Sequence, residues 1–432
     1  MSEMLKYYSM IKDKLRSKDN KVLFENFISL VFLQIANYAL PLITIPYLAY
    51  TLGVEVYGLV AGAQYLIQYF MMITDYGFNF SATRLVSIHR EDKTKISAIF
   101  SAVMIIKILI LFICLLAVLV IVFFNEKYSD DPMIYLATFG LVIGNLIFPV
   151  WLFQGFEKMK IVTIINVVTK LIFTICIFIF VQSSDDYLMV PILTSLGFLI
   201  SGLISFFVVR KLGVRFVFPG WEEIRFQLVD GWHVFISTIS ATMYMASNGF
   251  LLDVLTNNPI YVGYYSAGEK VIRAFASLFS PVSVALYPFI SKKLHENKKS
   301  GIELFMKFVK VVGVLSLLVS IGVLVLGEWL TNLVLGSDFS GSFVVMQILC
   351  VIPFFGTIGA MFAYQLFINI GLKHLIPRIL VIAFTLDISL NFLLIPTLHH
   401  IGAAIALGVT EVFVPVAFLS YYFLNAKRLQ HG

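Results

Sequence analysis

Charged residues are scarce in this chain. Asp, Glu, Lys and Arg make up 13% of its 432 residues, whereas hydrophobic residues make up 59%, and the mean hydropathy is +0.93. Soluble globular domains carry about 25% charged residues, so this composition excludes that class. A pI near 9.0 would suggest nucleic-acid binding in a soluble protein. Here it reflects the ordinary charge bias of loops at a membrane surface, and we expect no nucleic acid as a partner.

Cysteine is also scarce. Cys114, Cys176 and Cys350 lie within apolar stretches, and their spacing matches neither a disulfide framework nor a metal site. The loops that alternate with the basic ones are short and leave no room for an extramembrane catalytic domain. We therefore expect no cofactor, no metal and no enzymatic activity.

Long apolar stretches make up most of the chain. A transmembrane helix needs roughly 20 predominantly apolar residues, and the sequence contains twelve such stretches. They lie at about 22–52, 57–83, 96–124, 133–156, 161–182, 187–209, 226–256, 260–290, 302–327, 341–370, 375–396 and 402–424. Most of the 31 Lys and Arg residues fall in the N-terminal arm, in alternate loops and after the last stretch, whereas the intervening loops contain only Lys127. This asymmetry predicts that both termini are cytoplasmic.

The segment 210–225 divides the stretches six and six. Shifting one half by 205 residues places Tyr57-Gly58 on Val262-Gly263, which predicts a parallel repeat with a central site between the halves. Two similar hairpins arising by chance are the alternative. We predict an all-α polytopic membrane protein with twelve transmembrane helices in two six-helix lobes around a central cavity. The predicted units are a cytoplasmic arm (1–21), an N-lobe (22–210), a cytoplasmic linker (211–225), a C-lobe (226–426) and a cytoplasmic tail (427–432).

Six basic residues fall inside the stretches. Lys307 and Lys310 lie near one end, where long side chains reach the interface. The others lie near the middle of their stretches, at Lys107, Lys170, Lys270 and Arg273. A charge at this depth costs roughly 2.5–3.5 kcal/mol on insertion scales, so it must face the bundle interior or a wet cavity.

Polar residues at helical spacing accompany these charges. Ser266, Glu269/Lys270 and Arg273 form one stripe, and Gln64, Gln68, Asp75 and Asn79 form another. A third stripe includes Tyr244 and Asn248. We expect the stripes to line one cavity. A cationic cavity suits phosphate or diphosphate, which points to an amphiphilic, phosphate-bearing substrate.

The carboxylates inside the stretches allow two interpretations. Asp387, Glu411 and Asp75 are candidates to carry a coupling ion, from a proton or a sodium gradient. They can equally neutralise the buried lysines. Glu269 and Arg273, four residues apart, can likewise form an ion pair that only stabilises a helix.

Four segments carry a family resemblance. TDYGFNFSATRLVSIHREDKTK (74–95) and FPVWLFQGFEKMK (148–160) resemble Wzx-type polysaccharide flippases, as do VGYYSAGEKVIRAF (262–275) and YPFISKKL (287–294). The resemblance implies the multidrug/oligosaccharidyl-lipid/polysaccharide exporter superfamily, with two lobes that alternate between inward-open and outward-open states. The implied substrate is an undecaprenyl-diphosphate-linked oligosaccharide. It would be flipped to the periplasmic leaflet of the bacterial inner membrane for O-antigen, enterobacterial common antigen or capsule assembly. Candidate partners are membrane lipid, a polysaccharide polymerase and a chain-length regulator.

The resemblance also implies site residues. Lys270 and Arg273, with Glu269 beside them, match the central cations of the family's eighth helix. The related lipid II flippases carry further arginines in their first two helices. This chain has none there, and Arg84 stands at the expected cytoplasmic mouth.

Two other functions fit parts of the pattern. A multidrug extruder of the same superfamily would prefer an acidic, aromatic cavity, which the four central basic residues disfavour. A membrane-embedded polysaccharide polymerase or glycosyltransferase would normally need a large periplasmic loop or an acidic pair at the membrane surface.

Overall fold

The computed structural model describes residues 18–425, and it describes their side chains except at 18–31, 33–36, 38–39, 233, 237–245 and 284–285. None of the residues in this range lies in a β-strand. The helices are α2 (Lys18–Asp75), α3 (Phe78–Ile88), α4 (Lys93–Phe124), α5 (Glu126–Ser129), α6 (Pro132–Ile147), α7 (Val150–Gly155), α8 (Met159–Phe180), α9 (Met189–Lys211), α10 (Trp221–Thr256), α11 (Pro259–Ser277), α12 (Ser280–Glu296), α13 (Lys298–Val334), α14 (Ser340–Leu349), α15 (Ile352–Ala360) and α16 (Leu375–Leu424), with the short 3-10 helices η1 (Ser184–Asp186) and η2 (Ser337–Phe339) and the π-helix η3 (Met361–Phe367).

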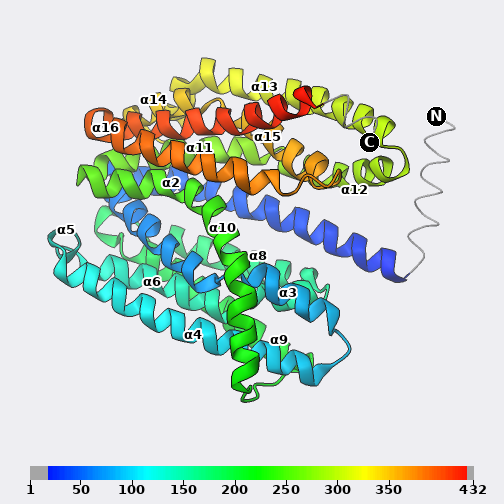
Figure 1. The fold of residues 1–432 in the computed structure, drawn as a ribbon. Helices are drawn as coiled ribbons and strands as arrows, with labels where there is room; N and C mark the ends of the chain where they lie inside the picture. The colour runs from blue at the N-terminus through cyan, green and yellow to red at the C-terminus, as the bar shows by residue number, and fades with distance from the viewer. Residues whose placement is uncertain (1–17, 426–432) are drawn as a thin grey trace.

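Several of these helices are broken. The longest two, α2 and α16, contain non-helical residues at Gly53 (φ 71°) and His399 (φ 50°), and the chain turns back at each (Figure 1). The runs α11–α12 and α14–η3 bend by 47° and 44°. Most of the twelve predicted stretches coincide with a helix, a bent run or one arm of a broken helix, whereas 57–83 runs from α2 into α3 and 133–156 covers both α6 and α7. By length and composition alone, the described chain has seven membrane-spanning helices, or up to nine if each bent pair counts as one.

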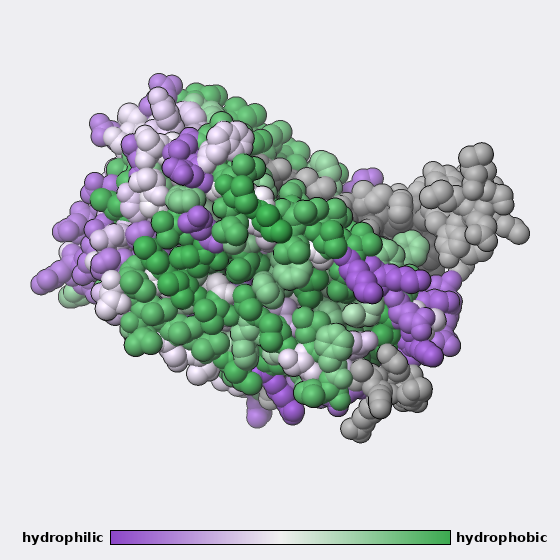
Figure 2. Space-filling view, turned by 90° about the horizontal axis from the view of Figure 1, so that it is seen from above, coloured by the Kyte–Doolittle hydropathy of each residue, from purple (hydrophilic) through white to green (hydrophobic). Residues whose placement is uncertain are grey.

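On the face seen in Figure 2, apolar side chains cover the middle of the molecule and polar residues gather toward its two ends. The exposed faces of α4 and α13 carry large apolar residues such as Phe112 and Leu318. Water would make this exposure unfavourable, whereas lipid makes it neutral. The chain is therefore a multi-pass membrane protein. We use "basic end" for the end with loops 89–92, 156–158 and 212–220, and "opposite end" for the end with α5, η1 and the breaks at Gly53 and His399.

The first-half helices α4, α6, α8 and α9 lie together, and the second-half helices α11 and α13–α16 lie together on the other side (Figure 1). Helix α10 runs between them. Its first turns lie in the segment predicted as the cytoplasmic linker and pack on α3 and α4, and the helix also packs extensively on α16. The core is apolar, and the buried clusters include Trp151, Phe305 and Phe362.

The two halves meet at the opposite end through reciprocal backbone contacts. A Cβ atom on Gly58 would lie 1.8 Å from the carbonyl oxygen of Pro259. A Cβ atom on Gly263 would lie 2.3 Å from the carbonyl oxygen of Val54. Gly58 and Gly263 are equivalent under the 205-residue shift, and so are Val54 and Pro259. The contact is therefore two-fold symmetric, which supports the parallel repeat.

Candidate functional site

Lys270 lies in the middle of α11, and its ammonium group faces α2. Asn258 caps α11 by accepting a hydrogen bond from the Ile260 amide, and Pro259 occupies the first turn, as is typical of a helix start. The Lys270 ammonium lies 3.4 Å from Gln64 Oε1, 3.5 Å from the Tyr57 hydroxyl and 5.3 Å from the centre of the Tyr57 ring. Within the described part of the chain it contacts no carboxylate.

Arg273 lies one turn further along α11 and carries acidic partners. Its Nε donates to Glu269 Oε1 at 2.7 Å, and its Nη1 lies 4.0 Å from Glu411 Oε1 on α16. The Tyr65 hydroxyl donates to Glu269 Oε2 at 2.9 Å. Arg273 Nη2 is buried and has no hydrogen-bond partner among the described residues. Nη2 carries two of the five guanidinium donors, and a buried donor without a partner is costly unless a ligand or water accepts from it.

These side chains form what we call the central cluster: Tyr57, Gln64, Tyr65, Glu269, Lys270, Arg273 and Glu411. Helix α10 supports it from one side, because Gly249 lies so close to the Tyr65 ring that a Cβ atom there would be 2.3 Å away. The structure thus brings together four of the predicted substrate-binding residues (Gln64, Glu269, Lys270 and Arg273) with one predicted coupling residue, Glu411.

A second polar group surrounds Asp387, which is fully buried. Its carboxylate accepts hydrogen bonds from Ser247 Oγ (2.9 Å), Asn248 Nδ2 (3.2 Å), Asn391 Nδ2 (3.2 Å) and Thr410 Oγ1 (3.5 Å). We call these five residues the Asp387 cluster. Thr410 adjoins Glu411 in α16, so this cluster borders the central cluster. All of its described partners are neutral, whereas Arg273 stands beside Glu411.

Lys107 and Asp75 form a third group. Asp75 Oδ1 accepts from Lys107 Nζ and from Asn145 Nδ2, each at 3.0 Å. The Lys107 side chain is 2% exposed and that of Asp75 is 30% exposed. The buried lysine is therefore neutralised by a carboxylate that is itself partly accessible.

Lys170 lies apart from the other three central cations. Its ammonium group donates to Asn37 Oδ1 at 2.6 Å, and the described residues offer it no carboxylate. Neither Lys170 nor Lys107 contacts the central cluster among the described residues. Of the remaining predicted residues, Gln68 is exposed, Asn248 belongs to the Asp387 cluster, and Tyr244 lies outside the residues whose side chains are described.

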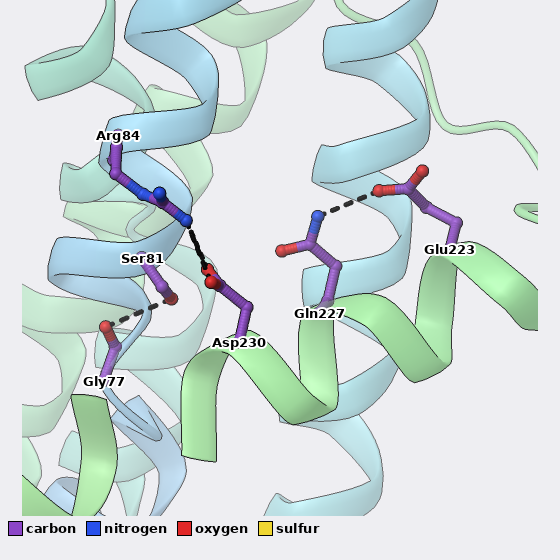
Figure 3. Close-up of polar contacts among 6 residues, drawn as sticks. All are labelled: Gly77, Ser81, Arg84, Glu223, Gln227 and Asp230. Atoms are coloured by element: carbon purple, nitrogen blue, oxygen red, sulfur yellow. Dashed lines mark hydrogen bonds and ion pairs between the residues drawn. The ribbon is translucent and has the colours of Figure 1, made fainter. Parts of the chain in front are cut away.

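Arg84 is at the basic end, where Figure 3 shows it reaching from α3 to α10. Its Nη2 donates to both carboxylate oxygens of Asp230, at 2.9 and 3.1 Å. Two helical turns before Asp230, Glu223 accepts from Gln227 at 2.9 Å and pairs with Lys95 at 2.7 Å. These contacts attach the first turns of α10 to the first half.

Sequence reasoning missed several partners. Tyr57, Tyr65, Asn145 and Thr410 are polar residues inside the predicted stretches, and helical spacing alone did not separate them from ordinary core residues. Asp230 and Asp253 could have been predicted to pair with basic residues, because each is a carboxylate inside the stretch 226–256. No group of three or more His, Cys, Asp or Glu side chains in the described range could hold a metal ion.

Comparison with known proteins shows the family. Residues 23–294 match the family described as polysaccharide biosynthesis protein. The chain is 31% identical over 397 residues to an Escherichia coli (strain K12) protein provisionally named an O-antigen transporter, and the match covers 92% of this chain and 95% of that one.

Solved structures show the same fold. An inward-facing multidrug resistance MATE family transporter of the MOP superfamily matches with a TM-score of 0.72 at 12% identity, covering 93% of this chain and 99% of that chain. The lipid II flippase MurJ, in its inward closed conformation, matches with a TM-score of 0.64 at 14% identity, covering 95% and 89%. These matches confirm the predicted all-α membrane fold. The chain belongs to the polysaccharide biosynthesis protein family.

Proposed function

We propose that this protein is a transporter that flips an undecaprenyl-diphosphate-linked oligosaccharide from the cytoplasmic to the periplasmic leaflet of the bacterial inner membrane. The family match and the O-antigen transporter name of the E. coli relative support transport of a lipid-linked polysaccharide unit over an enzymatic role. In this proposal the basic end faces the cytoplasm, together with both termini, and the halves alternate in opening to the two sides. The product serves O-antigen, common-antigen or capsule assembly.

The observation that carries the proposal is the state of Lys270. An ammonium group at mid-membrane depth ordinarily needs a carboxylate or several short hydrogen bonds. Among the residues whose side chains are described, Lys270 has only two neutral oxygens, at 3.4 and 3.5 Å. With the unpaired Nη2 of Arg273 one turn away, α11 presents two cationic groups whose hydrogen bonds are incompletely satisfied. A diphosphate supplies the acceptor oxygens that both groups lack.

Other parts of the substrate have matching surroundings. The sugars would contact neutral polar side chains near the cations, such as Gln64 and Gln68, and the apolar prenyl chain would remain in lipid. Asp75, held by Lys107 in the first half, is assigned a mainly structural role. Arg84 would meet the phosphates as they enter at the basic end.

A proton or sodium ion is the proposed driving ion, and Asp387 is the proposed carrier. Its four described hydrogen-bond donors are neutral, so binding a cation would neutralise a buried charge. Glu411 faces Arg273 instead and is the proposed link between ion and substrate, because it adjoins Thr410 of the Asp387 cluster.

Substitutions of the two cations test the proposal. Truncating a buried charged contact typically costs about 2–5 kcal/mol, so Lys270→Ala and Arg273→Ala should abolish surface polysaccharide at normal expression. Arg273→Lys keeps the charge but loses the planar fork, and should retain part of the activity. Lys292→Ala is the control, because Lys292 is 60% exposed and pairs only weakly with Glu296. Wild-type polysaccharide in both alanine variants would refute the diphosphate assignment.

A further inference from the structure

Lys127, the basic residue that departs from the loop charge pattern, is bound to the other half of the molecule. It lies in α5, between two first-half helices, and its ammonium group is 2.9 Å from Asp253 Oδ2 near the end of α10. Lys127 also donates to the backbone carbonyl of Asp253, and the Tyr128 hydroxyl donates to the same carboxylate at 3.4 Å. The two side chains are only 19% and 10% exposed. A largely buried ion pair therefore joins the halves at the opposite end.

This ion pair stands beside a close backbone approach between the halves. A Cβ atom on Gly62 would lie 2.9 Å from Asp253 Oδ1. One turn earlier in α2, Gly58 touches Pro259 at the start of α11. A methyl group does not fit at Gly58, and at Gly62 it would push against the Asp253 carboxylate. The opposite end is thus closed by a backbone contact and by the Lys127–Asp253 pair.

We propose that Lys127 and Asp253 are the gating pair of the opposite end: paired, they hold it closed while the central cluster is reached from the basic end, and they separate when it opens. This inference rests on the alternating access of the proposed function. A buried ion pair suits a gate better than an apolar contact does. The attraction between two buried charges is largely offset by their lost hydration, and water restores that hydration when they separate. Separating apolar surfaces of similar size exposes them to water with no such compensation.

At the basic end, the ion pairs between the halves are more exposed to water than Lys127–Asp253 is. There, α10 is attached to the first half by Arg84–Asp230 and Lys95–Glu223, in which Arg84 is 58% exposed and Lys95 is 43% exposed. Water already reaches these pairs, so they hold the helix only weakly. Asp230→Asn is therefore a matched control: it removes a cross-half carboxylate from the same helix, but at the other end.

The test measures the distance across the opposite end. Spin labels are placed at Asp130→Cys in the first half and Asp338→Cys in the second, both exposed, with the three native cysteines replaced by alanine. In lipid nanodiscs, double electron–electron resonance should show mainly one short distance between the two labels in the otherwise native chain. Asp253→Asn and Lys127→Met should each raise the ratio of long to short distances at least about tenfold. Asp230→Asn should leave it unchanged, and the exchange Lys127→Asp with Asp253→Lys should restore the short distance.

The pair is not a gate if both single variants keep the native distance distribution, or if the charge exchange opens the end as far as the single variants do. Because the measurement needs no substrate, a wrong substrate assignment would not change its outcome. If the single variants lose surface polysaccharide while the distances stay native, the proposed transport stands and the gate is refuted.

Discussion

Arg273 on α11 faces Glu411 on α16, with 4.0 Å between Arg273 Nη1 and Glu411 Oε1. The guanidinium has a second, closer acidic contact, in which Nε lies 2.7 Å from Glu269 Oε1. The tight contact lies within one helix and holds the side chain in place. The loose one joins two helices, and Glu411 adjoins Thr410, which contacts Asp387. Glu411 is therefore placed to compete with a substrate anion for Arg273, and the two carboxylate positions can be tested separately.

Asp387→Asn and Glu411→Gln should have different effects on transport. In proteoliposomes with imposed proton or sodium gradients, Asp387→Asn should remove the dependence on the gradient, because the neutral amide cannot exchange a cation. Glu411→Gln should keep the gradient response but retain the anionic substrate more tightly, since Arg273 loses a competing carboxylate. If both variants fold and respond to the gradients like the native protein, neither carboxylate carries the coupling ion.

Lys107 and Asp75 should contribute mainly to folding. Removing one partner of a buried ion pair typically costs about 3–5 kcal/mol, because a charge is left without compensation. Lys107→Met and Asp75→Asn should each lower the melting temperature in detergent, and the double variant should recover part of the loss. Single variants that melt normally yet lose surface polysaccharide would instead place this pair in substrate binding.

The contact between Gly58 and Pro259 should tolerate no side chain. In Gly58→Ala the new methyl group would meet a backbone carbonyl 1.8 Å away, so α2 and α11 must separate, at a cost of roughly 1–3 kcal/mol. Gly322→Ala in α13 is the control, because nothing lies within 4 Å of its Cβ position and alanine favours a helix by about 1 kcal/mol. The first variant should melt below the native protein and the second at or above it. Equal melting temperatures would show that the contact is not tight.

The attachment of α10 to α4 should weaken in acid. Burial raises the pKa of Glu223, but hydrogen bonds from Lys95 and Gln227 more than offset this, so that the pKa lies below its ordinary value. A carboxyl group with a lowered pKa stabilises the folded state above its unfolded pKa of about 4.3, and this contribution is lost as the pH falls through the folded value.

Between pH 7 and pH 3, Glu223→Gln should therefore lose less stability than the native protein. The difference between the two losses should be about 1 kcal/mol or less, because Lys95 is partly exposed. Melting temperatures in detergent at the two pH values measure the difference. The exposed neighbour provides the control, as Glu222→Gln should follow the native protein. Identical acid sensitivity in all three proteins would contradict the prediction.

Membrane topology follows from the loop charges. A reporter that is active only in the periplasm should give no signal after Gln430 and a clear signal near Ser184, because the loop charges predict a cytoplasmic C-terminus and a periplasmic loop at Ser184. A periplasmic C-terminus would contradict both the orientation and the division into two equal halves.

The sequence by itself determined that the chain is an all-α, multi-pass membrane protein, and it predicted the twelve apolar stretches and the polar face of α11. These depend on local properties, namely apolar runs long enough to span lipid, and polar side chains spaced so that they share one helical face. The 205-residue shift that aligned Gly58 with Gly263 also reappears as a physical contact between the halves.

Only the tertiary structure decided which charges meet. Helical spacing placed Lys107, Lys170, Lys270 and Arg273 at similar depths but could not show that they occupy three separate surroundings. It could not pair Lys107 with Asp75, nor Lys127 with Asp253, because these partners lie on different helices. The cost of a buried charge depends on what lies within a few ångströms of it, and that is set by how the helices pack against one another.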